Sequence, residues 1–255
     1  MLKNKVGLIV GLSNEYSIAY KTAVQCHSAG ATLALSCQKQ LASRAIPLAE
    51  KVQGTLYECD AIDATSVDEM IKQIKEKFGK LDFIIHSVAF APKDCLSGRF
   101  LDTSYADFAL TMNTSCFSFI YLAKVASEIM QDGGSIVTMT YYGSQKVIPN
   151  YNIMGVAKAA LEASVRYAAL DLGIKKIRVN AISAGPIKTL AASGIGGFSK
   201  MLHWVEKNSI MKENVSGTDV GDSAVYLVSD MSKNVTGQTL FVDSGYSVVG
   251  MKLEE

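Results

Sequence analysis

The sequence has little excess of either charge. Twenty-five lysines and arginines stand against 24 aspartates and glutamates in 255 residues, a formal net charge of +1. Proteins that bind nucleic acid or an acidic membrane usually carry a basic excess, so the composition gives no electrostatic case for either partner. No apolar run reaches the roughly 20 residues that span a bilayer, and residues 1–6 lead directly into a short apolar segment. We therefore expect no export signal, no membrane contact and a cytoplasmic location.

The sequence also lacks the residue spacings that hold metals or form disulfides. Its five cysteines are odd in number and widely scattered, without the paired spacing of a zinc site or a CxxC redox motif. The three histidines, His27, His86 and His203, stand far apart. We expect free thiols in a reducing compartment and no metal site.

The chain does have a regular alternation of short β-branched runs and amphipathic segments. Strands are expected over residues 5–10, 31–36, 55–59, 81–86, 135–140, 177–182 and 239–242. Helices are expected over residues 17–29, 41–52, 67–78, 105–130, 151–172, 200–208 and 218–229. Strands separated by helices of about ten or more residues indicate a parallel sheet. We predict an α/β fold over residues 1–255: a single doubly wound, Rossmann-like parallel sheet with helices on both faces.

The first predicted strand ends in a turn of the kind that binds a pyrophosphate. Gly11 is followed by a predicted helix start at Ser17 and Ile18. Free N–H groups and the positive dipole end of a helix face an anion at such a turn. Only one glycine of the usual three is present, so the turn by itself also suits a purely structural role.

Two later strand ends bear on the adenosine half of a dinucleotide. Gln38 follows the second strand, where such folds read the ribose. Its neutral amide suits NAD(H) and leaves NADP(H) open, with Lys39 and Arg44 nearby for a phosphate. Asp60 follows the third strand, with Ala61 beside it, where a carboxylate accepts from the adenine amino group. Its alternative role is to cap the following helix.

Tyr151 and Lys158 form a candidate acid–base pair. They lie seven residues apart in a predicted helix, close to two turns, so both side chains project from about the same face. The helix follows an apolar strand directly, which would bring the pair to a strand end. Without further context, Lys158 also fits a solvated lysine on a helix surface.

Four segments together resemble the short-chain dehydrogenase/reductase superfamily over nearly the whole chain. They are Gly11 with Ser17-Ile18-Ala19, and residues 86–92, 148–158 and 179–195. Within that superfamily they resemble the divergent enoyl-[acyl-carrier-protein] reductases of bacterial type II fatty acid synthesis (FabI type). Ordinary members carry a tyrosine four residues before the lysine and a serine about thirteen before that tyrosine. Here those places hold Met154 and Tyr141, and a tyrosine stands one turn earlier at Tyr151, which is the mark of the enoyl reductases.

The resemblance implies reduction of the carbon–carbon double bond of trans-2-enoyl thioesters on acyl carrier protein, with NADH as reductant. It also implies a homotetramer, the habit of the family. In this reading Tyr151 donates to the enolate oxygen and Lys158 holds the nicotinamide ribose. Tyr141 lines the acyl pocket near the thioester; its alternative role is aromatic packing at a strand end.

The resemblance further implies two sets of contact residues. The implied cofactor contacts are Gly11, Ser17, Ile18, Gln38, Asp60, Ala61, Val88, Lys158, Pro186, Ile187 and Thr189. The implied substrate contacts are Ala91, Tyr141, Tyr151, Met154, Ala191, Ile195 and Phe198. The last three belong to an expected substrate-binding flap around residues 190–210, whose alternative is an ordinary surface loop and helix. Lys200 is a basic residue on that flap for the acidic carrier protein, whereas Gly196 and Ser199 stand where relatives are often basic.

Two other functions remain open at this point. A 3-oxoacyl or other carbonyl reductase of the same superfamily needs the tyrosine that Met154 replaces. A non-catalytic dinucleotide-binding protein would be free to lose Tyr151, Lys158 and Tyr141, which this chain keeps.

Overall fold

A computed structural model describes residues 1–190 and 192–251. Within them lies one seven-stranded sheet in the order β3-β2-β1-β4-β5-β6-β7. The strands are β1 (Val6–Val10), β2 (Thr32–Cys37), β3 (Thr55–Glu58), β4 (Phe83–His86), β5 (Gly134–Thr140), β6 (Ile177–Ala184) and β7 (Thr239–Val242). Every neighbouring pair is parallel, and the strand order changes direction between β1 and β4. The predicted doubly wound parallel sheet is therefore confirmed.

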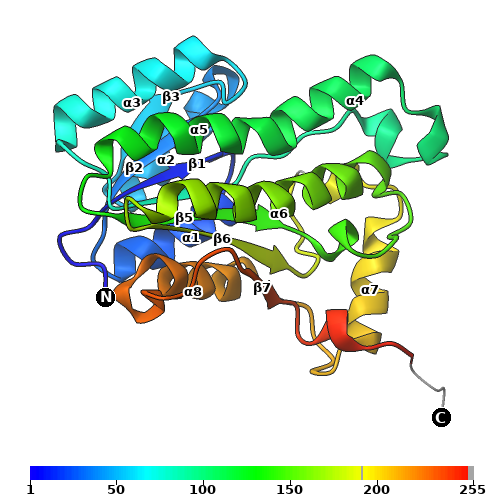
Figure 1. Cartoon of the computed structure of the whole chain (residues 1–255). Helices are drawn as coiled ribbons and strands as arrows, with labels where there is room; N and C mark the ends of the chain where they lie inside the picture. Colours follow the sequence, from blue (N-terminus) through cyan, green and yellow to red (C-terminus); the bar gives the residue numbers. More distant parts are fainter. Residues whose placement is uncertain (191, 252–255) are drawn as a thin grey trace.

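Helices cover both faces of this sheet (Figure 1). One face packs against α1 (Ile18–Ser28), α2 (Ala42–Lys51) and α8 (Gly217–Val228). The other face packs against α3 (Ala64–Phe78), α5 (Ser118–Ala126) and α6 (Asn152–Gly173). The central strands are consequently buried on both sides, which explains the continuous apolar runs of the sequence. All four residues of β4 are buried.

Short polar side chains set the helix starts near the carboxyl ends of the strands. Ser17 caps α1, where its hydroxyl accepts from the Tyr20 N–H at 3.2 Å. Ser216 and Asp219 form a reciprocal capping box at the start of α8. Because α1 starts just beyond β1, its N-terminus lies at the carboxyl edge of the sheet.

The long helix predicted over residues 105–130 is confirmed as one continuous helical segment, but it is not regular α-helix throughout. The structure instead has α4 (Tyr105–Met112), a π-helical turn (Asn113–Phe117), α5 and a final 3-10 turn (Ser127–Ile129). The Thr114 hydroxyl donates to the Leu110 carbonyl at 2.9 Å, and the Ser118 hydroxyl donates to the Thr114 carbonyl at 2.6 Å. Hydroxyls that bond carbonyls one turn back compete with the helical ladder and loosen it at this point.

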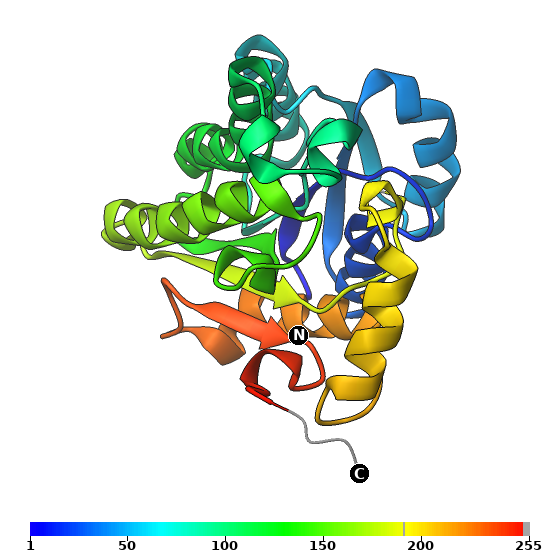
Figure 2. The ribbon, with the colours of Figure 1, turned by 90° about the vertical axis from the view of Figure 1, so that its right-hand side faces the viewer.

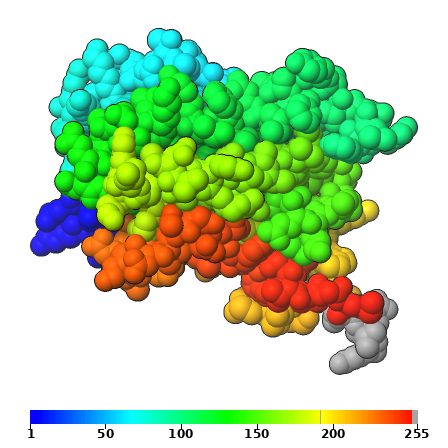
Figure 3. All heavy atoms as spheres, in the orientation of Figure 1, coloured from blue at the N-terminus to red at the C-terminus, as the bar shows by residue number. Residues whose placement is uncertain are grey.

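The segment after β6 leaves the sheet and covers part of its carboxyl edge. A 3-10 turn (Ala192–Gly194) leads into α7 (Phe198–Asn208), which stands along one side of this edge in yellow in Figure 2. The C-terminal segment, red in Figure 3, lies beside α7. The Trp204 and Tyr246 rings pack edge to face there, with their centroids 5.6 Å apart. None of the helices formed by the described residues is long and apolar enough to cross a membrane.

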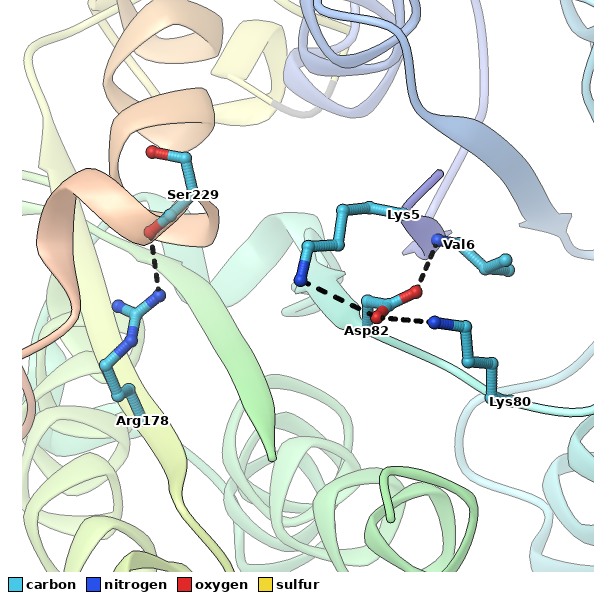
Figure 4. A network of polar contacts seen from close by, with 6 residues as sticks. All are labelled: Lys5, Val6, Lys80, Asp82, Arg178 and Ser229. Carbon is cyan, nitrogen blue, oxygen red and sulfur yellow. Dashed lines mark hydrogen bonds and ion pairs between the residues drawn. The ribbon is translucent and has the colours of Figure 1, made fainter. Parts of the chain in front are cut away.

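The amino edge of the sheet is held by paired charges (Figure 4). Asp82, just before β4, accepts from the Val6 N–H at 2.8 Å and from Lys80 Nζ at 3.0 Å. Lys5 Nζ lies 3.9 Å from the same carboxylate. This carboxylate thereby ties the start of β1 to the start of β4.

Arg178 makes a second polar junction at this edge (Figure 4). Its guanidinium donates to the carbonyls of Leu227 at 2.7 Å and Ser229 at 3.1 Å, and to the Ser232 hydroxyl at 2.8 Å. These groups lie at and just after the end of α8, where helix carbonyls lack helical partners. The guanidinium therefore caps α8 and fastens it to β6.

Candidate active site

A cavity of about 460 Å³ lies at the carboxyl edge, beside the ends of β1, β4, β5 and β6. Open α/β sheets bind ligands at this edge, where the strand order changes direction. Most of the site residues expected from the sequence line it: Gly11, Ser17, Ile18, Val88, Ala91, Tyr141, Tyr151, Met154, Lys158, Pro186, Ile187, Thr189, Ile195 and Phe198. The fold thus brings positions from widely separated parts of the chain into one cavity.

Three of the expected cofactor residues do not line the cavity: Gln38, Asp60 and Ala61. Gln38 is exposed, and its side-chain oxygen accepts from Gln40 Nε2 at 2.9 Å. Asp60 is exposed as well, and its carboxylate accepts from the Ile62 N–H at 3.2 Å. They follow β2 and β3, on the strand-order side away from β4. Ala191, an expected substrate contact, lies outside the described residues.

The alternative role of Asp60 as a helix cap was wrong. The cap of α3 is Asp63, whose carboxylate accepts from the Thr65 N–H at 3.0 Å. The Asp60 side chain closes a short turn before that helix instead. A contact of Asp60 with adenine remains a prediction.

The turn after β1 needs glycine at its first position. Gly11 has φ +105°, and a Cβ there would lie 2.4 Å from the Ser87 carbonyl oxygen at the end of β4. Any side chain would separate the two strand ends. Ser17 closes the far side of the turn, since its hydroxyl donates to the Asn14 carbonyl at 2.7 Å. Ile18 then opens α1 against the cavity, where the first-turn N–H groups other than that of Tyr20 suit an anion.

Tyr141 and Tyr151 form an aromatic pair in the cavity wall. Their rings meet edge to face with centroids 5.0 Å apart. Burial raises the pKa of both phenols well above the usual value near 10, so both are neutral donors at pH 7. The Tyr141 hydroxyl contacts Met201 Sδ of α7 at 3.4 Å. The Tyr151 hydroxyl makes no hydrogen bond to any residue in the described ranges.

Two glycines allow the turn after β5 to pack closely against the start of α6. A Cβ at Gly143, in the 3-10 turn Tyr142–Ser144, would lie 2.4 Å from Tyr151 Cδ1. A Cβ at Gly155 would lie 2.7 Å from the Gly143 carbonyl oxygen. The position of the Tyr151 ring is therefore determined by the backbone of this turn.

Lys158 is buried, with 5% of its surface exposed. Its Nζ donates to the Met139 carbonyl at 2.8 Å. Burial lowers the pKa of this ammonium from 10.5 to about 8, while Cys116 and Glu162 act in the opposite direction. The alternative of a solvated surface lysine was wrong. An ammonium has three N–H donors, so two remain for a ligand in the cavity.

Several lining residues were not predicted from the sequence: Ser13, Ser87, Phe90, Lys93, Leu96, Met139, Thr140, Ala184 and Gly185. Those that end β5 and β6 had a signal, because ligand sites of such sheets gather at strand ends. Leu96 had none, because it ends a 3-10 turn (Lys93–Leu96) well beyond the end of β4 in the sequence. Among the described residues, no three His, Cys, Asp or Glu side chains are grouped to hold a metal ion.

A family model described as enoyl-(acyl carrier protein) reductase matches residues 11–247. The chain therefore belongs to the enoyl-(acyl carrier protein) reductase family. The enoyl-[acyl-carrier-protein] reductase [NADH] 1 of Rhizobium meliloti is 53% identical to it over 254 residues, which cover 99% of this chain and 93% of that protein. The resemblance noted from the sequence motifs is thus confirmed over nearly the whole length.

Two crystal structures of this family share the fold of the chain. The enoyl-(acyl-carrier-protein) reductase from Anaplasma phagocytophilum, in complex with NAD, has a TM-score of 0.96 and 48% identity. The matched region covers 99% of this chain and 97% of the Anaplasma chain. The Bacillus cereus reductase with NADP+ and indole naphthyridinone also has a TM-score of 0.96, with 41% identity and coverage of 98% and 99%.

Proposed function

We infer that this chain is an NADH-dependent enoyl-[acyl-carrier-protein] reductase of fatty acid synthesis, which reduces the double bond of trans-2-enoyl thioesters. Family membership supports this activity. The observation that carries the site assignment is the grouping of Tyr151, Lys158 and Tyr141 around one cavity. Met154 also lines the cavity, where a carbonyl reductase has its proton-donating tyrosine. A thioether has no proton to donate, which argues against carbonyl reduction.

The lining of the cavity suits the pyrophosphate and nicotinamide parts of a dinucleotide. It extends from the turn at Gly11 and the start of α1 to Pro186 and Thr189 after β6. The α1 N-terminus would hold the pyrophosphate, and the segment after β6 would hold the nicotinamide carboxamide. The Thr189 hydroxyl accepts from the Ala192 N–H at 3.1 Å, which leaves its own hydrogen for that carboxamide. Bound NADH supplies a hydride to the β-carbon of the substrate.

The cofactor assignment rests first on the named relatives. The Rhizobium meliloti relative is described as NADH-dependent, whereas the Bacillus cereus relative is described with NADP+. Gln38 is neutral and exposed in this chain, so it places no negative charge against a 2′-phosphate. NADP(H) therefore remains open as a second cofactor.

In this proposal the chain stabilises the charge that builds on the substrate. The neutral Tyr151 phenol donates to the thioester oxygen as the enolate forms. Lys158 holds the nicotinamide ribose through the two N–H groups that Met139 leaves available, and its charge favours the developing anion. Tyr141 supports the Tyr151 ring edge-on and borders the acyl chain.

The segment around residues 190–210 acts in this proposal as a substrate flap. Ile195 and Met201 pack against the buried apolar cluster that holds both site tyrosines. Phe198 lines the cavity from the start of α7. These apolar side chains would close over the acyl chain and exclude water from the hydride transfer.

The acyl carrier protein is the proposed partner at this flap. Lys188, Lys200 and Lys212 are exposed on or near it and suit an acidic surface. A cytoplasmic location is proposed with it, since all five cysteines are free and buried.

A homotetramer is proposed as the assembly. Several large apolar side chains are exposed over α4, the π-turn, α5 and α6: Tyr105, Phe108, Phe117, Ile120, Tyr167, Leu170 and Ile174. β7 lies at an edge of the sheet. Exposed apolar surface of this extent favours burial against further copies of the chain, and closed symmetric assemblies are the common outcome.

The experiment that tests the function follows the loss of NADH absorbance with two substrates. Crotonyl thioester should be reduced, and acetoacetyl thioester should not. Oxidation of NADH with acetoacetyl thioester alone would overturn the proposal in favour of a carbonyl reductase. Binding of NADH without turnover of any enoyl thioester would favour a non-catalytic protein. The same assay with NADPH decides the cofactor preference.

A further inference from the structure

Glu162 is a buried carboxylate whose only effect described so far is to raise the pKa of Lys158. It lies on α6, four residues beyond Lys158, with 6% of its surface exposed. It does not line the cavity. A buried carboxylate is costly to desolvate, so its contacts are the place to look for its function.

The Glu162 carboxylate accepts hydrogen bonds from residues on both sides of Tyr141 in the sequence. Its Oε1 accepts from the Thr140 hydroxyl at 2.7 Å and from the Ser144 hydroxyl at 2.5 Å. Thr140 immediately precedes Tyr141, and Ser144 follows it by three residues. Gln145 Nε2 lies at 3.5 Å from Oε2, a longer contact. One carboxylate thus fastens the end of β5 and the turn after it to α6.

Movement of this turn would displace both tyrosines. The Ser144 N–H donates to the Tyr141 carbonyl at 2.9 Å, so Ser144 and Tyr141 belong to one closed turn. Gly143 of the same turn packs directly against the Tyr151 ring. The Tyr141 and Tyr151 rings also contact each other. Tyr151 and Lys158 flank the early part of α6, the helix to which Glu162 anchors the turn.

We propose that Glu162 is a positioning residue, which clamps residues 140–144 onto α6 and so sets Tyr141 and Tyr151 relative to Lys158. It touches no reacting atom and acts through the turn. The catalytic consequence rests on the proposed function, because it assumes that the two tyrosines face the substrate. An error of about 1 Å in the position of a catalytic group costs on the order of 100-fold in rate.

The test compares Glu162→Ala with Glu162→Gln, measured as kcat with crotonyl thioester and as Kd for NADH. The alanine variant loses the acceptor of both hydroxyls, and we expect its kcat to fall about 10- to 100-fold. Its Kd for NADH should change much less than kcat at pH 7, because no Glu162 hydrogen bond reaches the turn after β1, α1 or Lys158, whose ammonium stays protonated at that pH. The glutamine variant keeps an oxygen for both hydroxyls and should restore kcat to within about fivefold of wild type.

Ser144→Ala supplies an independent measurement if Glu162→Ala does not fold. It removes one of the two hydroxyls and should lower kcat by about threefold or more. The double variant with Glu162→Ala should show no further loss, because both changes break the same contact. Glu128→Ala is the matched control: this exposed carboxylate pairs with Lys175 at 2.8 Å on the surface, and its removal should leave kcat unchanged.

Two outcomes would overturn the role of Glu162. One is a wild-type kcat in Glu162→Ala or in Ser144→Ala. The other is a glutamine variant as slow as the alanine variant, which would mean that the negative charge matters rather than the clamp. Crystal structures of wild type, Glu162→Gln and Ser144→Ala test the clamp without an activity measurement. The Tyr141 ring should be shifted in the Ser144→Ala structure. If residues 140–144 keep their wild-type position in that variant, the proposal is contradicted. Lack of crotonyl reduction by the wild-type protein would instead count against the proposed function.

Discussion

The charged side chains at the two edges of the sheet differ in how many hydrogen-bond partners they have. At the amino edge, Arg178 donates to several carbonyl and hydroxyl oxygens at the end of α8, and Asp82 has both a backbone and a lysine partner. At the carboxyl edge, Lys158 is buried deeper than either, with one carbonyl partner. The hydroxyl of Tyr151, which lines the same cavity, has no hydrogen-bond partner among the described residues.

This difference separates polar groups that stabilise the fold from polar groups to which the proposed function assigns a ligand. Fully paired charges offset their desolvation and hold elements together. A buried ammonium with spare N–H donors lowers stability, and proteins accept that loss chiefly where chemistry needs the group. The comparison predicts that substitutions at the carboxyl edge reduce activity and spare stability, whereas those at the amino edge do the reverse.

Lys158→Met should give the largest effect on activity. The loss of the ammonium should lower kcat by about 100- to 1000-fold, as for the removal of a preorganised donor, and should weaken NADH binding. Stability should be unchanged or higher, because a buried charge with one partner is replaced by an apolar side chain. Steady-state kinetics, NADH titration and urea unfolding measure the three quantities. Unchanged affinity for NADH would contradict the ribose role.

Arg178→Met should show the opposite pattern. The carbonyls of Leu227 and Ser229 would lose a charged donor but keep hydroxyl donors from Ser135 and Ser232. The free energy of unfolding should therefore fall by about 1.5–3 kcal/mol, the contribution of hydrogen bonds from a charged group. The kcat per folded molecule should stay within about twofold of wild type, since distant sites act independently. Urea unfolding and a crotonyl thioester assay on the same sample check both. A large loss of kcat with intact stability would break the division between the edges.

Tyr151→Phe should lower kcat with crotonyl thioester by about 10- to 100-fold. This corresponds to the loss of a hydrogen bond to a charged group, which contributes about 1.5–3 kcal/mol. The Kd for NADH should be nearly unchanged. Phenylalanine keeps the ring contact with Tyr141, so folding should not suffer. A wild-type rate would show that another donor serves the enolate oxygen.

Lys158 should also make stability and activity depend on pH in opposite directions. Its pKa is about 8 in the folded chain, against 10.5 for an unperturbed lysine. Between these values the unfolded chain holds more protons on this residue, so the contribution of Lys158 to the free energy of unfolding rises with pH through this window. The value of kcat/KM should fall above about pH 8 as the ammonium loses its proton. Urea unfolding of wild type and Lys158→Met from pH 7 to 10 isolates the effect on stability. The difference between their free energies of unfolding should become smaller as the pH rises.

Asp60→Asn should give the smallest effect. The residue is exposed and lies outside the cavity, so any contact with adenine is a solvated one. We expect the Kd for NADH to rise by about twofold to fivefold, in line with a modest hydrogen bond of about 0.5–1 kcal/mol. Fluorescence titration with NADH measures it. A tenfold or larger change would extend the binding site to the end of β3.

Patterns in the sequence were enough to predict the class of the fold, and most of the residues they singled out line one cavity. Alternating periodicity is a local property, so strands and helices were predicted close to their observed bounds, and a parallel sheet gathers its strand ends at one edge. The spacing of Tyr151 and Lys158 indicated a candidate acid–base pair, and the resemblance to a family pattern, with Met154 between them, implied an enoyl reductase; the family match agrees.

The tertiary structure alone decided how each of these groups is surrounded. Burial of Lys158, its bond to Met139 and the clamp of Glu162 on Thr140 and Ser144 join residues up to 22 positions apart. The π-turn at Asn113 and the position of Gln38 outside the cavity were equally beyond prediction. Desolvation and hydrogen-bond partners depend on which surfaces pack together in three dimensions, and a local pattern of side chains does not specify that packing.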